Sequence, residues 1–383
     1  MTCCGFGILE VGQAFAKPRL APRFYSLDDR PTIPPLRQSL FRIAIIEITA
    51  MIFALRRLAI LGLVLIFSLS LAAATRADDA KFHWADGPQA GTTDLLLGDQ
   101  PVVRYMALPY DNSTKDREHD TYKVYHHVFS PDGKTILTKG PGGQYTHHRG
   151  LYCAWNKTSY EGKTNDFWHC TNGASQRHVK FLDKTADAQH GAATVEIHWA
   201  DAEAKPVIIE TRSIDVRRAP AGTTGWQIDW RTSLASQRGE IKLEGDRQHA
   251  GFQFRAAQVV SEQKAARFIR PAGFPEKPEA VEAGDAGDPP AHSNLPWCAM
   301  TYPIDGQQVT VCYLEDPSLP KPSLFSERPY GRFGAFFKTT LAADKPLRLR
   351  YRIVITTGEA PARDTIQKWF DSFAAELKVA DAK

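Results

Sequence analysis

Apolar and polar residues alternate along much of the chain beyond residue 78, with the period of two that half-buried β-strands show. Gly, Pro, Asp or Asn bounds these runs, and Pro131-Asp132-Gly133-Lys134 is a turn signal between two of them. The clearest alternating runs are 193–199, 226–230, 309–313 and 347–355. The pattern therefore predicts antiparallel strands joined by tight turns.

A helical period occurs only near the end of the chain. After Asp364 or Thr365, either of which can cap a helix, four apolar residues fall on one face: Ile366, Trp369, Phe370 and Phe373. Strands and helices do not alternate, which disfavours a parallel sheet. We expect an all-β fold, a large antiparallel β-sandwich of the supersandwich or jelly-roll type with a short C-terminal helix.

The strongest apolar segment precedes the alternating part. Arg56 and Arg57 are followed by an uncharged apolar run, 58–71, and then by small residues over 72–77. A basic start, an apolar run too short to span a membrane comfortably and a small-residue cleavage site together indicate a signal peptide. The protein is then periplasmic or secreted, with no stable membrane span after the leader is cleaved.

These features divide the chain. We take Met51 as the initiator, so that 1–50 is a mis-called N-terminal extension, 51–77 is the signal peptide and 78–383 is a single β-sandwich domain. The alternative is an uncleaved membrane anchor with a cytoplasmic tail. Within the domain, Pro271–Pro290 is rich in Pro, Gly, Ala, Glu and Asp and has no apolar period, which predicts a long surface loop.

The net charge of +4 belongs to the leader and not to the domain. Nine of the 47 Lys and Arg residues and four of the 43 Asp and Glu residues lie within 1–77, which leaves 38 basic and 39 acidic side chains in the domain. A nearly neutral domain gives no electrostatic reason to expect nucleic acid as a partner.

Four cysteines remain in the domain: Cys153, Cys170, Cys298 and Cys312. An even number in an oxidising compartment permits up to two disulfides, and three pairings are open. Their spacings form no CxxC pair, which argues against a structural zinc site.

The densest polar cluster is the glycine-rich segment Gly140–Gly150, which contains His147, His148 and Arg149. A rigid loop of this kind can present imidazoles to a ligand, and histidine serves as acid, base or metal ligand near neutral pH. On a strand the two histidines would point to opposite faces, so at most one faces a site unless the backbone bends. We expect one of them to be a catalytic acid or base.

A second cluster spans Glu244–Arg255. His249, Gln253 and Arg255 alternate with apolar residues, so one strand face would carry all three, and such aligned groups need a ligand, water or one another. The alternative is a solvated outer face. We expect Glu244 or His249 to be the catalytic partner of the first cluster, with Gln253 and Arg255 binding substrate.

A third cluster contains Arg328, Tyr330 and Arg332 beside Glu327. Arginines next to Tyr and Glu can bind carboxylates or sugar hydroxyls, or can form a structural ion-pair network in a turn. Together with Arg149, these three residues complete the predicted substrate-binding set.

Metal binding is a further possibility. The hairpin through Asp132-Gly133 could return His126 or His127 towards His147. Three histidines and a carboxylate would hold Zn, Fe or Mn, and the candidates are His127, His147, His148, His249 and Glu244. The spacings match neither HExxH nor HxH, so the sequence leaves the cofactor unknown, with a divalent metal possible.

Four segments together resemble the exported family named methane oxygenase PmoA: Tyr145–Leu151, His249–Arg255, Trp297–Met300 and Arg328–Gly334. The likeness covers nearly all of the domain, and it implies an exported protein of a kind often found in carbohydrate-degrading bacteria. The integral-membrane methane monooxygenase subunit is not implied, because that protein spans the membrane several times and this chain has a single apolar run, the predicted leader.

We therefore expect an exported enzyme that acts on a saccharide or sugar-derived small molecule, as hydrolase, lyase or epimerase, by His-based acid/base chemistry. Eight Trp and 12 Tyr residues could stack on sugar rings, and no paired carboxylates of the usual glycosidase kind are evident. Two alternatives stay open. A non-catalytic carbohydrate-binding or envelope protein predicts aromatic residues on a flat exposed face, and a metal-dependent oxygenase predicts three imidazoles meeting at one point.

Overall fold

The computed structural model describes residues 80–274 and 293–381, which belong to one compact unit, Arg76–Lys383. The predicted N-terminal extension and signal peptide, 1–50 and 51–77, lie outside the described residues, as does most of the predicted surface loop. No helix of the described residues is long and apolar enough to cross a membrane.

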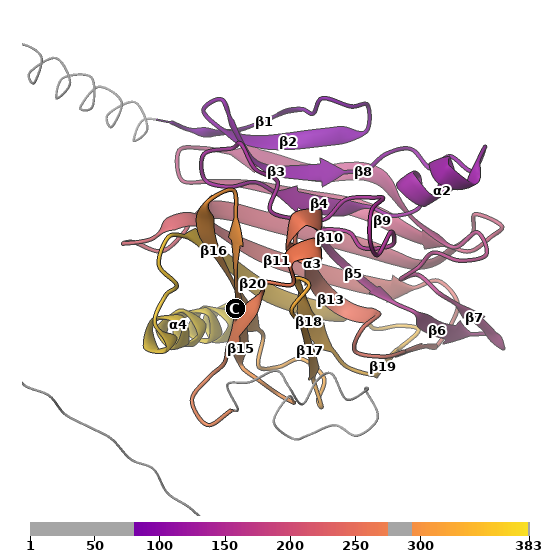
Figure 1. The fold of residues 1–383 in the computed structure, drawn as a ribbon. Helices are drawn as coiled ribbons and strands as arrows, with labels where there is room; N and C mark the ends of the chain where they lie inside the picture. Colours follow the sequence, from indigo (N-terminus) through magenta and orange to yellow (C-terminus); the bar gives the residue numbers. More distant parts are fainter. Residues whose placement is uncertain (1–79, 275–292, 382–383) are drawn as a thin grey trace, which may run out of the picture. The chain divides into compact units, whose positions relative to one another are not determined.

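Three antiparallel sheets make up the described part of the chain (Figure 1). The first sheet contains, in spatial order, β1 (Phe82–Asp86), β2 (Thr92–Leu97), β3 (Gln100–Met106), β4 (Tyr125–Val128), β5 (Leu151–Trp155), β13 (Ala250–Arg255), β18 (Arg332–Phe336) and β17 (Leu324–Arg328). The second sheet contains β14 (Arg267–Ile269), β15 (Trp297–Ile304), β16 (Gln307–Glu315), β20 (Leu347–Thr357), β11 (Thr224–Ser236), β10 (Pro206–Arg218), β9 (His190–Ala200) and β8 (Ser175–Ala186). The third contains β19 (Thr339–Leu341), β12 (Ile241–Glu244), β6 (Lys157–Tyr160) and β7 (Lys163–Asn165).

Three helices accompany the sheets: α2 (Lys115–Thr121), α3 (Gln258–Gln263) and the C-terminal α4 (Arg363–Asp381). The four alternating runs of the sequence all lie within long strands of the second sheet. The predicted fold class, an antiparallel all-β sandwich with a C-terminal helix, is confirmed.

The main core lies between the two large sheets, where their inward side chains meet. The ring of Phe252 on β13 lies 4.7 Å from the ring of Trp230 on β11 and 4.7 Å from that of Tyr351 on β20. Because successive side chains of a strand point to opposite faces, Phe252 and Phe254 fill this core while Gln253 and Arg255 face the other way. That second face of β13 carries the polar groups of the candidate site.

Helix α4 covers the outer face of the second sheet. On β15, Cys298 and Met300 face the core between the sheets, whereas Trp297 and Ala299 pack against the helix. This strand is therefore apolar on both faces. The helix contributes Ile366, Trp369, Phe370, Phe373 and Leu377, a face that includes all four residues predicted from the helical period.

The start of α4 differs from the prediction. The helix begins at Arg363, so Asp364 and Thr365 lie in its first turn and neither is the cap. The backbone N–H groups of Thr365 and Ile366 both donate to the carbonyl oxygen of Ala362, which starts the turn earlier than the capping residue types suggested.

The four cysteines of the domain are buried free thiols, so the disulfides that their even number permits do not form. The register of β15 and β16 gives a physical reason for one pair. Cys298 lies opposite Tyr313, and Ala299 lies opposite Cys312, so the two thiols point to opposite faces of the sheet. Cys298 joins the main core and Cys312 joins the cluster under α4.

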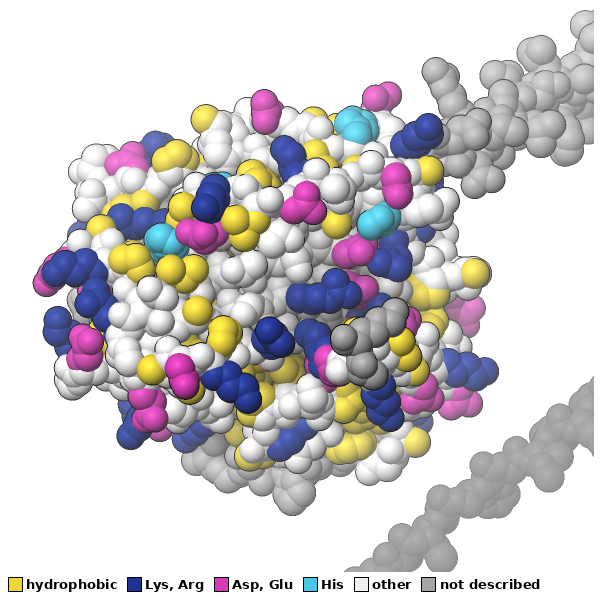
Figure 2. All heavy atoms as spheres, turned by 180° about the vertical axis from the view of Figure 1, so that it is seen from behind, with side chains coloured by type: hydrophobic (Ala, Val, Ile, Leu, Met, Phe, Trp, Pro, Cys, Tyr) yellow, Lys and Arg dark blue, Asp and Glu magenta, His cyan; other side chains and the backbone are white. Residues whose placement is uncertain are grey.

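Charged side chains of both signs are interspersed over the face shown in Figure 2, with apolar side chains scattered between them. Such a surface does not concentrate one sign of charge. Among the described residues, the large apolar side chains that are well exposed are aliphatic: Ile136, Val179, Leu182, Val259 and Val379.

Candidate functional site

Three histidines from distant parts of the chain converge: His147, His169 and His249. The ring centroid of His169 lies 4.8 Å from that of His147 and 4.7 Å from that of His249, and the third separation is 5.7 Å. One ligand atom of each lies within 4.8 Å of the other two. All three rings are partly exposed, so a solute can reach them.

His169 lies in the turn that follows β7, and Asp166 holds it there. The carboxylate of Asp166 accepts hydrogen bonds from the backbone N–H groups of Trp168 at 2.9 Å and His169 at 2.7 Å. Its other oxygen lies 2.7 Å from Nδ1 of the same imidazole. Because a carboxylate can only accept, Nδ1 carries the proton and Nε2 of His169 is left with its lone pair.

His249 repeats this arrangement in the turn before β13. Asp246 accepts from the backbone N–H groups of Gln248 at 2.8 Å and His249 at 3.0 Å, and its Oδ1 lies 3.0 Å from Nδ1 of His249. The second oxygen of Asp246 accepts from the side-chain amide of Asn156 at 2.8 Å. Burial alone would raise the pKa of Asp246, but the hydrogen bonds from His249 and Gln248 outweigh it and hold the pKa at about 2.

His147 completes the triangle from the glycine-rich loop. Its Nε2 atom is buried and has no hydrogen-bond partner among the described residues. Burial is the main cause that lowers the pKa of His147 to about 2, and the charges of Lys123 and Arg255, and of His169 and His249 whenever these are protonated, act in the same direction. The imidazole is therefore neutral, and its Nε2 is available to a ligand.

The segment Gly140–Gly150 is a series of bends and turns between β4 and β5 and not a strand. Tyr145 has a φ of 56°, in the left-handed region, and the N–H of His148 donates to its carbonyl oxygen at 2.9 Å. This bend brings the rings of His147 and His148 to 4.7 Å from each other. The rule that neighbouring strand histidines face opposite ways therefore does not apply.

Two buried cations hold the loop in shape. Lys139 donates from Nζ to the carbonyl oxygen of Gly140 at 2.9 Å and also to that of Gly142. Arg149 donates to three carbonyl oxygens, at 2.7 Å, 2.8 Å and 2.7 Å: those of Thr146, His148 and His119. Arg149, predicted to bind substrate, is thus engaged with the backbone of the loop that carries His147.

Aromatic rings flank the histidines on the loop side. The ring of Tyr145 stacks on His148 at 5.0 Å and on Tyr330 at 4.6 Å. Tyr330 lies in the hairpin between β17 and β18, and the guanidinium carbon of Arg332 lies 5.5 Å from its ring centroid. Arg332 also donates to Oε1 of Gln248 at 3.1 Å, which connects this hairpin to the turn of His249.

Gln253 and Arg255 form one connected pair on β13. Arg255 donates from Nη1 to Oε1 of Gln253 at 2.8 Å and from Nη2 to the carbonyl oxygen of Gln248 at 3.0 Å. Its guanidinium carbon lies 5.2 Å from the ring centroid of Trp168. Both predicted binding residues therefore lie under the turns that carry the histidines, and Arg255 is 1% exposed.

Other predicted residues lie elsewhere. Glu244 forms an ion pair of 3.0 Å with Lys157 on the small sheet, so the carboxylates that contact the site histidines are Asp166 and Asp246 instead. Arg328 donates to the carbonyl oxygen of Glu327 at 3.1 Å at the end of β17.

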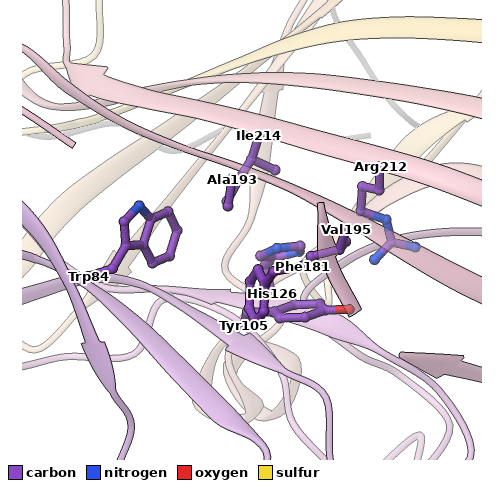
Figure 3. A pocket seen from close by; sticks show the side chains of 8 residues that line it. All are labelled: Trp84, Tyr105, His126, Phe181, Ala193, Val195, Arg212 and Ile214. Carbon is purple, nitrogen blue, oxygen red and sulfur yellow. The ribbon is translucent and has the colours of Figure 1, made fainter. Parts of the chain in front are cut away.

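The hairpin after β4 does not bring its histidines into contact with His147 in the part of the chain that the structure describes. His127 lies 2.9 Å from Oγ1 of Thr138. His126 stacks on Tyr105 at 4.9 Å and lines a cavity between the large sheets with Trp84 (Figure 3). That cavity holds about 10 Å³, room for roughly one water molecule and none for a sugar.

A larger, polar groove of about 230 Å³ lies on the other side of Asp166. Asn156 and Asp166, which orient the site histidines, also line this groove, and further polar lining comes from Tyr160, Asn165, Asn172 and Asp201. Amide and carboxylate groups of this kind suit a ligand with many hydroxyls.

Sequence reasoning missed His169, Asp166 and Asp246. The available signal is the repeated spacing Asp-x-x-His, at 166–169 and 246–249. The same spacing also occurs at Asp187–His190, where it makes a comparable turn between β8 and β9, and at Asp116–His119, which lies within α2, so the spacing alone predicts neither the turn nor the site.

Three imidazoles with one face open suit a transition metal such as zinc, copper, iron or nickel. Carboxylates on the outer nitrogens of metal-bound histidines fix the ring orientation and raise the basicity of the ligand. Metal–nitrogen bonds of about 2.0–2.1 Å imply nitrogens roughly 3.3 Å apart, so the longest separation in the present triangle, at most 4.8 Å, would shorten by up to about 1.5 Å on binding. The residues present fit such an ion.

Comparison of the sequence with models of known protein families shows which family the chain belongs to. A model of a family of unknown function, DUF6807, matches residues 92–371. The chain belongs to DUF6807. No curated protein sequence matches it. This membership covers all three histidines and both aspartates of the site, and neither supports nor contradicts the resemblance to the exported methane oxygenase PmoA family.

Solved structures show a distant likeness. A heparan sulfate lyase from Pedobacter heparinus aligns at 9% identity and a TM-score of 0.35, over 73% of this chain and 38% of that one. A heparinase III aligns at 9% identity and a TM-score of 0.30, over 73% and 36%. A GalM/aldose epimerase homologue from C. elegans aligns at 10% identity and a TM-score of 0.28, over 74% and 100%. The chain spans less than two-fifths of the first two structures, and likeness at this level concerns the β-rich fold alone.

Proposed function

We propose that this DUF6807 protein is a metal-dependent enzyme that acts on a saccharide or sugar derivative, with His147, His169 and His249 as the metal ligands. The observation that carries the proposal is the pair of Asp-x-x-His turns, which engage Nδ1 of His169 and His249 and leave their Nε2 atoms available beside His147, whose own Nε2 is buried and has no partner among the described residues. Three imidazole nitrogens within 4.8 Å of one another are a ligand set.

The chemistry follows from this set. A divalent ion held by three histidines would polarise a substrate oxygen or a water molecule. The protein itself would fix the three imidazoles through Asp166 and Asp246, keep His147 neutral, and offer the polar groove beside Asp166 to hydroxyl groups. This agrees with hydrolase, lyase or epimerase chemistry on a sugar and assigns His147 and His249 as ligands and not as acid and base.

A purely binding protein is less well supported. Such a protein would tie its histidines into structural hydrogen bonds and expose a flat aromatic surface. His147 instead has a ring nitrogen without a partner, and among the described residues the exposed large apolar side chains include no aromatic one. The convergence of three imidazoles is also what the oxygenase alternative requires, so the identity of the metal separates these two enzyme classes.

The test is elemental analysis of the full chain, purified without chelator, beside His169→Ala and the control His190→Ala. His190 occupies a similar Asp-x-x-His turn away from the triangle. We expect about one metal ion per chain in the wild type and the control, and loss of the ion in His169→Ala. The three proteins are then assayed against a panel of oligosaccharides, with and without the metal.

Each outcome has a definite meaning. Zinc or another redox-inactive ion that His169→Ala removes, together with metal-dependent turnover of a saccharide, supports the proposal. Copper or iron with oxygen-dependent turnover moves the function to an oxygenase. Two results contradict the metal centre. One is a folded wild type that carries no metal after incubation with zinc, copper or iron, and the other is metal that His169→Ala retains.

A further inference from the structure

Three buried arginines of this protein are paired with a carboxylate. Arg212 is paired with Glu210 at 2.7 Å, and Arg352 is paired with Asp229 at 2.5 Å. Arg270 is paired in the same way with Glu327. This is the expected arrangement, because a charge removed from water is costly unless an opposite charge compensates it.

Four buried cations near the histidines have no such partner among the described residues. One is Lys139 of the glycine-rich loop, and the other three, Lys123, Arg149 and Arg255, are 3%, 0% and 1% exposed. In the part of the chain that the structure describes, their hydrogen bonds go to carbonyl oxygens and to the amide of Gln253, and no carboxylate lies within ion-pair distance of any of them. Aromatic rings are their other neighbours, with Tyr122 beside both Lys123 and Arg149.

Trp168 connects these cations to the histidines. Lys123 donates to its carbonyl oxygen, the guanidinium carbon of Arg255 lies 5.2 Å from its ring centroid, and its ring lies 6.3 Å from that of His249. The N–H groups at Nε1 of Trp168 and Nε of Arg255 are both buried and have no acceptor among the described residues. Both groups can only donate, so the missing partner must be an acceptor.

The metal would add to the positive charge of this region. A divalent ion at the three histidines would bring two further positive charges to a region whose buried cations have no carboxylate partner among the described residues, where burial already lowers the pKa of Lys123 to about 7. An anion is the species that balances such a site.

We propose that the region between Arg255 and the three histidines binds an oxyanion of the substrate, a carboxylate or a sulfate ester, so that the preferred substrate is an acidic sugar. This inference rests on the proposed function and names the substrate class of the same site. Arg255 and the N–H of Trp168 supply the donors, and Lys123 and Arg149 supply compensating charge beneath them.

The experiment compares three sugars that differ only at C6: D-glucose, D-glucuronate and D-glucose 6-sulfate. Their binding to the metal-loaded full chain is measured by isothermal titration calorimetry. The same titrations are run on Arg255→Gln, on Lys123→Met and on the control Arg217→Gln. Arg217 has a carboxylate partner, Asp215, at 2.9 Å, and neither residue lines the groove or belongs to the three histidines.

We expect at least one of the two acidic sugars to bind about tenfold or more tightly than glucose to the wild type and to Arg217→Gln, the advantage that a charge-assisted hydrogen bond confers. Arg255→Gln and Lys123→Met should reduce this advantage. Which acidic sugar binds assigns a carboxylate or a sulfate. Equal binding of all three sugars, no binding of either acidic sugar, or an advantage that survives in Arg255→Gln overturns the inference. Metal content is measured on the same samples: if the metal is present and the acidic sugars have no advantage, only this inference fails, and if the metal is absent the metal centre of the proposed function fails with it.

Discussion

Nδ1 of His169 lies 2.7 Å from a carboxylate oxygen of Asp166, and the backbone N–H of the same histidine donates to the other oxygen of that carboxylate. One side chain thus fixes both the backbone and the ring of a site histidine. The same double contact relates Asp246 to His249. Two independent turns therefore present their imidazoles in one protonation state, which is more than a single structural histidine requires.

Replacing Asp166 with alanine tests this relationship. Asp166→Ala keeps the imidazole of His169 but removes the acceptor of both its ring N–H and its backbone N–H, and loss of such an outer partner typically weakens metal affinity by about 10–100-fold. Competition with a chromophoric zinc chelator measures the affinity. Asp187→Ala is the matched control, because Asp187 caps the turn of His190 away from the triangle. Equal affinities in the two variants would contradict a role for Asp166 at the metal.

For the buried cations we predict that two similar substitutions change the free energy of unfolding in opposite directions. Lys123→Met removes an ammonium that has no carboxylate partner among the described residues, so we expect the free energy of unfolding to rise by about 1–3 kcal/mol. Arg212→Met should lower it by about 3–5 kcal/mol, because Glu210 is then buried without its partner. Urea denaturation of the metal-free proteins measures both free energies of unfolding. If Lys123→Met is destabilised as much as Arg212→Met, the neighbours of the Lys123 ammonium already compensate its charge in the folded protein.

The strand pattern could be read from the sequence because it is local. Each alternating run, such as 309–313, records which of its own side chains are buried. Pairing across the chain leaves no such record: β13 lies between β5 and β18, which begin at Leu151 and Arg332. The same holds for the disulfides that an even number of cysteines permits. The register of β15 and β16 places Cys298 and Cys312 on opposite faces, and the number of cysteines carries no information about this register.

The site was predictable only in part. His147 and His249 stand out because polar residues cluster around them, whereas His169 lies between Trp168 and Cys170 and has no such neighbourhood. Glu244 was preferred to Asp246, two residues away, although only the aspartate is short enough to accept from its own turn and from His249 together. Convergence of three turns is a property of the folded chain, and no spacing in the sequence expresses it.

The strand that follows His249 depends on a glycine. Gly251 has a φ of 81°, and a Cβ atom there would lie 2.0 Å from the carbonyl oxygen of Ala335 on β18. Gly142 has the same φ of 81°, but a Cβ atom there meets nothing within 4 Å. We expect Gly142→Ala to cost about 1–2 kcal/mol of stability through the dihedral alone, and Gly251→Ala to cost about 2–5 kcal/mol and to weaken metal binding. Thermal unfolding measures the loss of stability, and chelator competition measures the loss of metal affinity. If the two variants lose the same stability, the backbone of β18 moves enough to accommodate the Cβ atom at position 251.

Glu315, on β16, gives the protein a stability that depends on pH. Its side chain is 1% exposed, accepts a hydrogen bond from Oγ of Ser323 at 2.7 Å and lies 3.5 Å from Nζ of Lys321. Burial raises the pKa of Glu315 to about 7, although Lys321 and Ser323 oppose the shift. The folded carboxyl therefore keeps its proton between pH 4.5 and about pH 7, where the unfolded one has lost it.

Because the folded state binds more protons in that window, the contribution of Glu315 to stability is complete below pH 4.5 and is lost as the pH rises towards 7. The loss is on the order of 3 kcal/mol for a shift of this size. Glu315→Gln keeps an acceptor for Ser323 and cannot ionise, so its free energy of unfolding should not contain this decline. Urea denaturation at a series of pH values should give curves for the wild type and the variant that diverge between pH 4.5 and 7, with the variant relatively more stable at the upper end. Parallel curves would mean that the carboxyl is already ionised at pH 4.5 in the folded protein, with Lys321 compensating its burial.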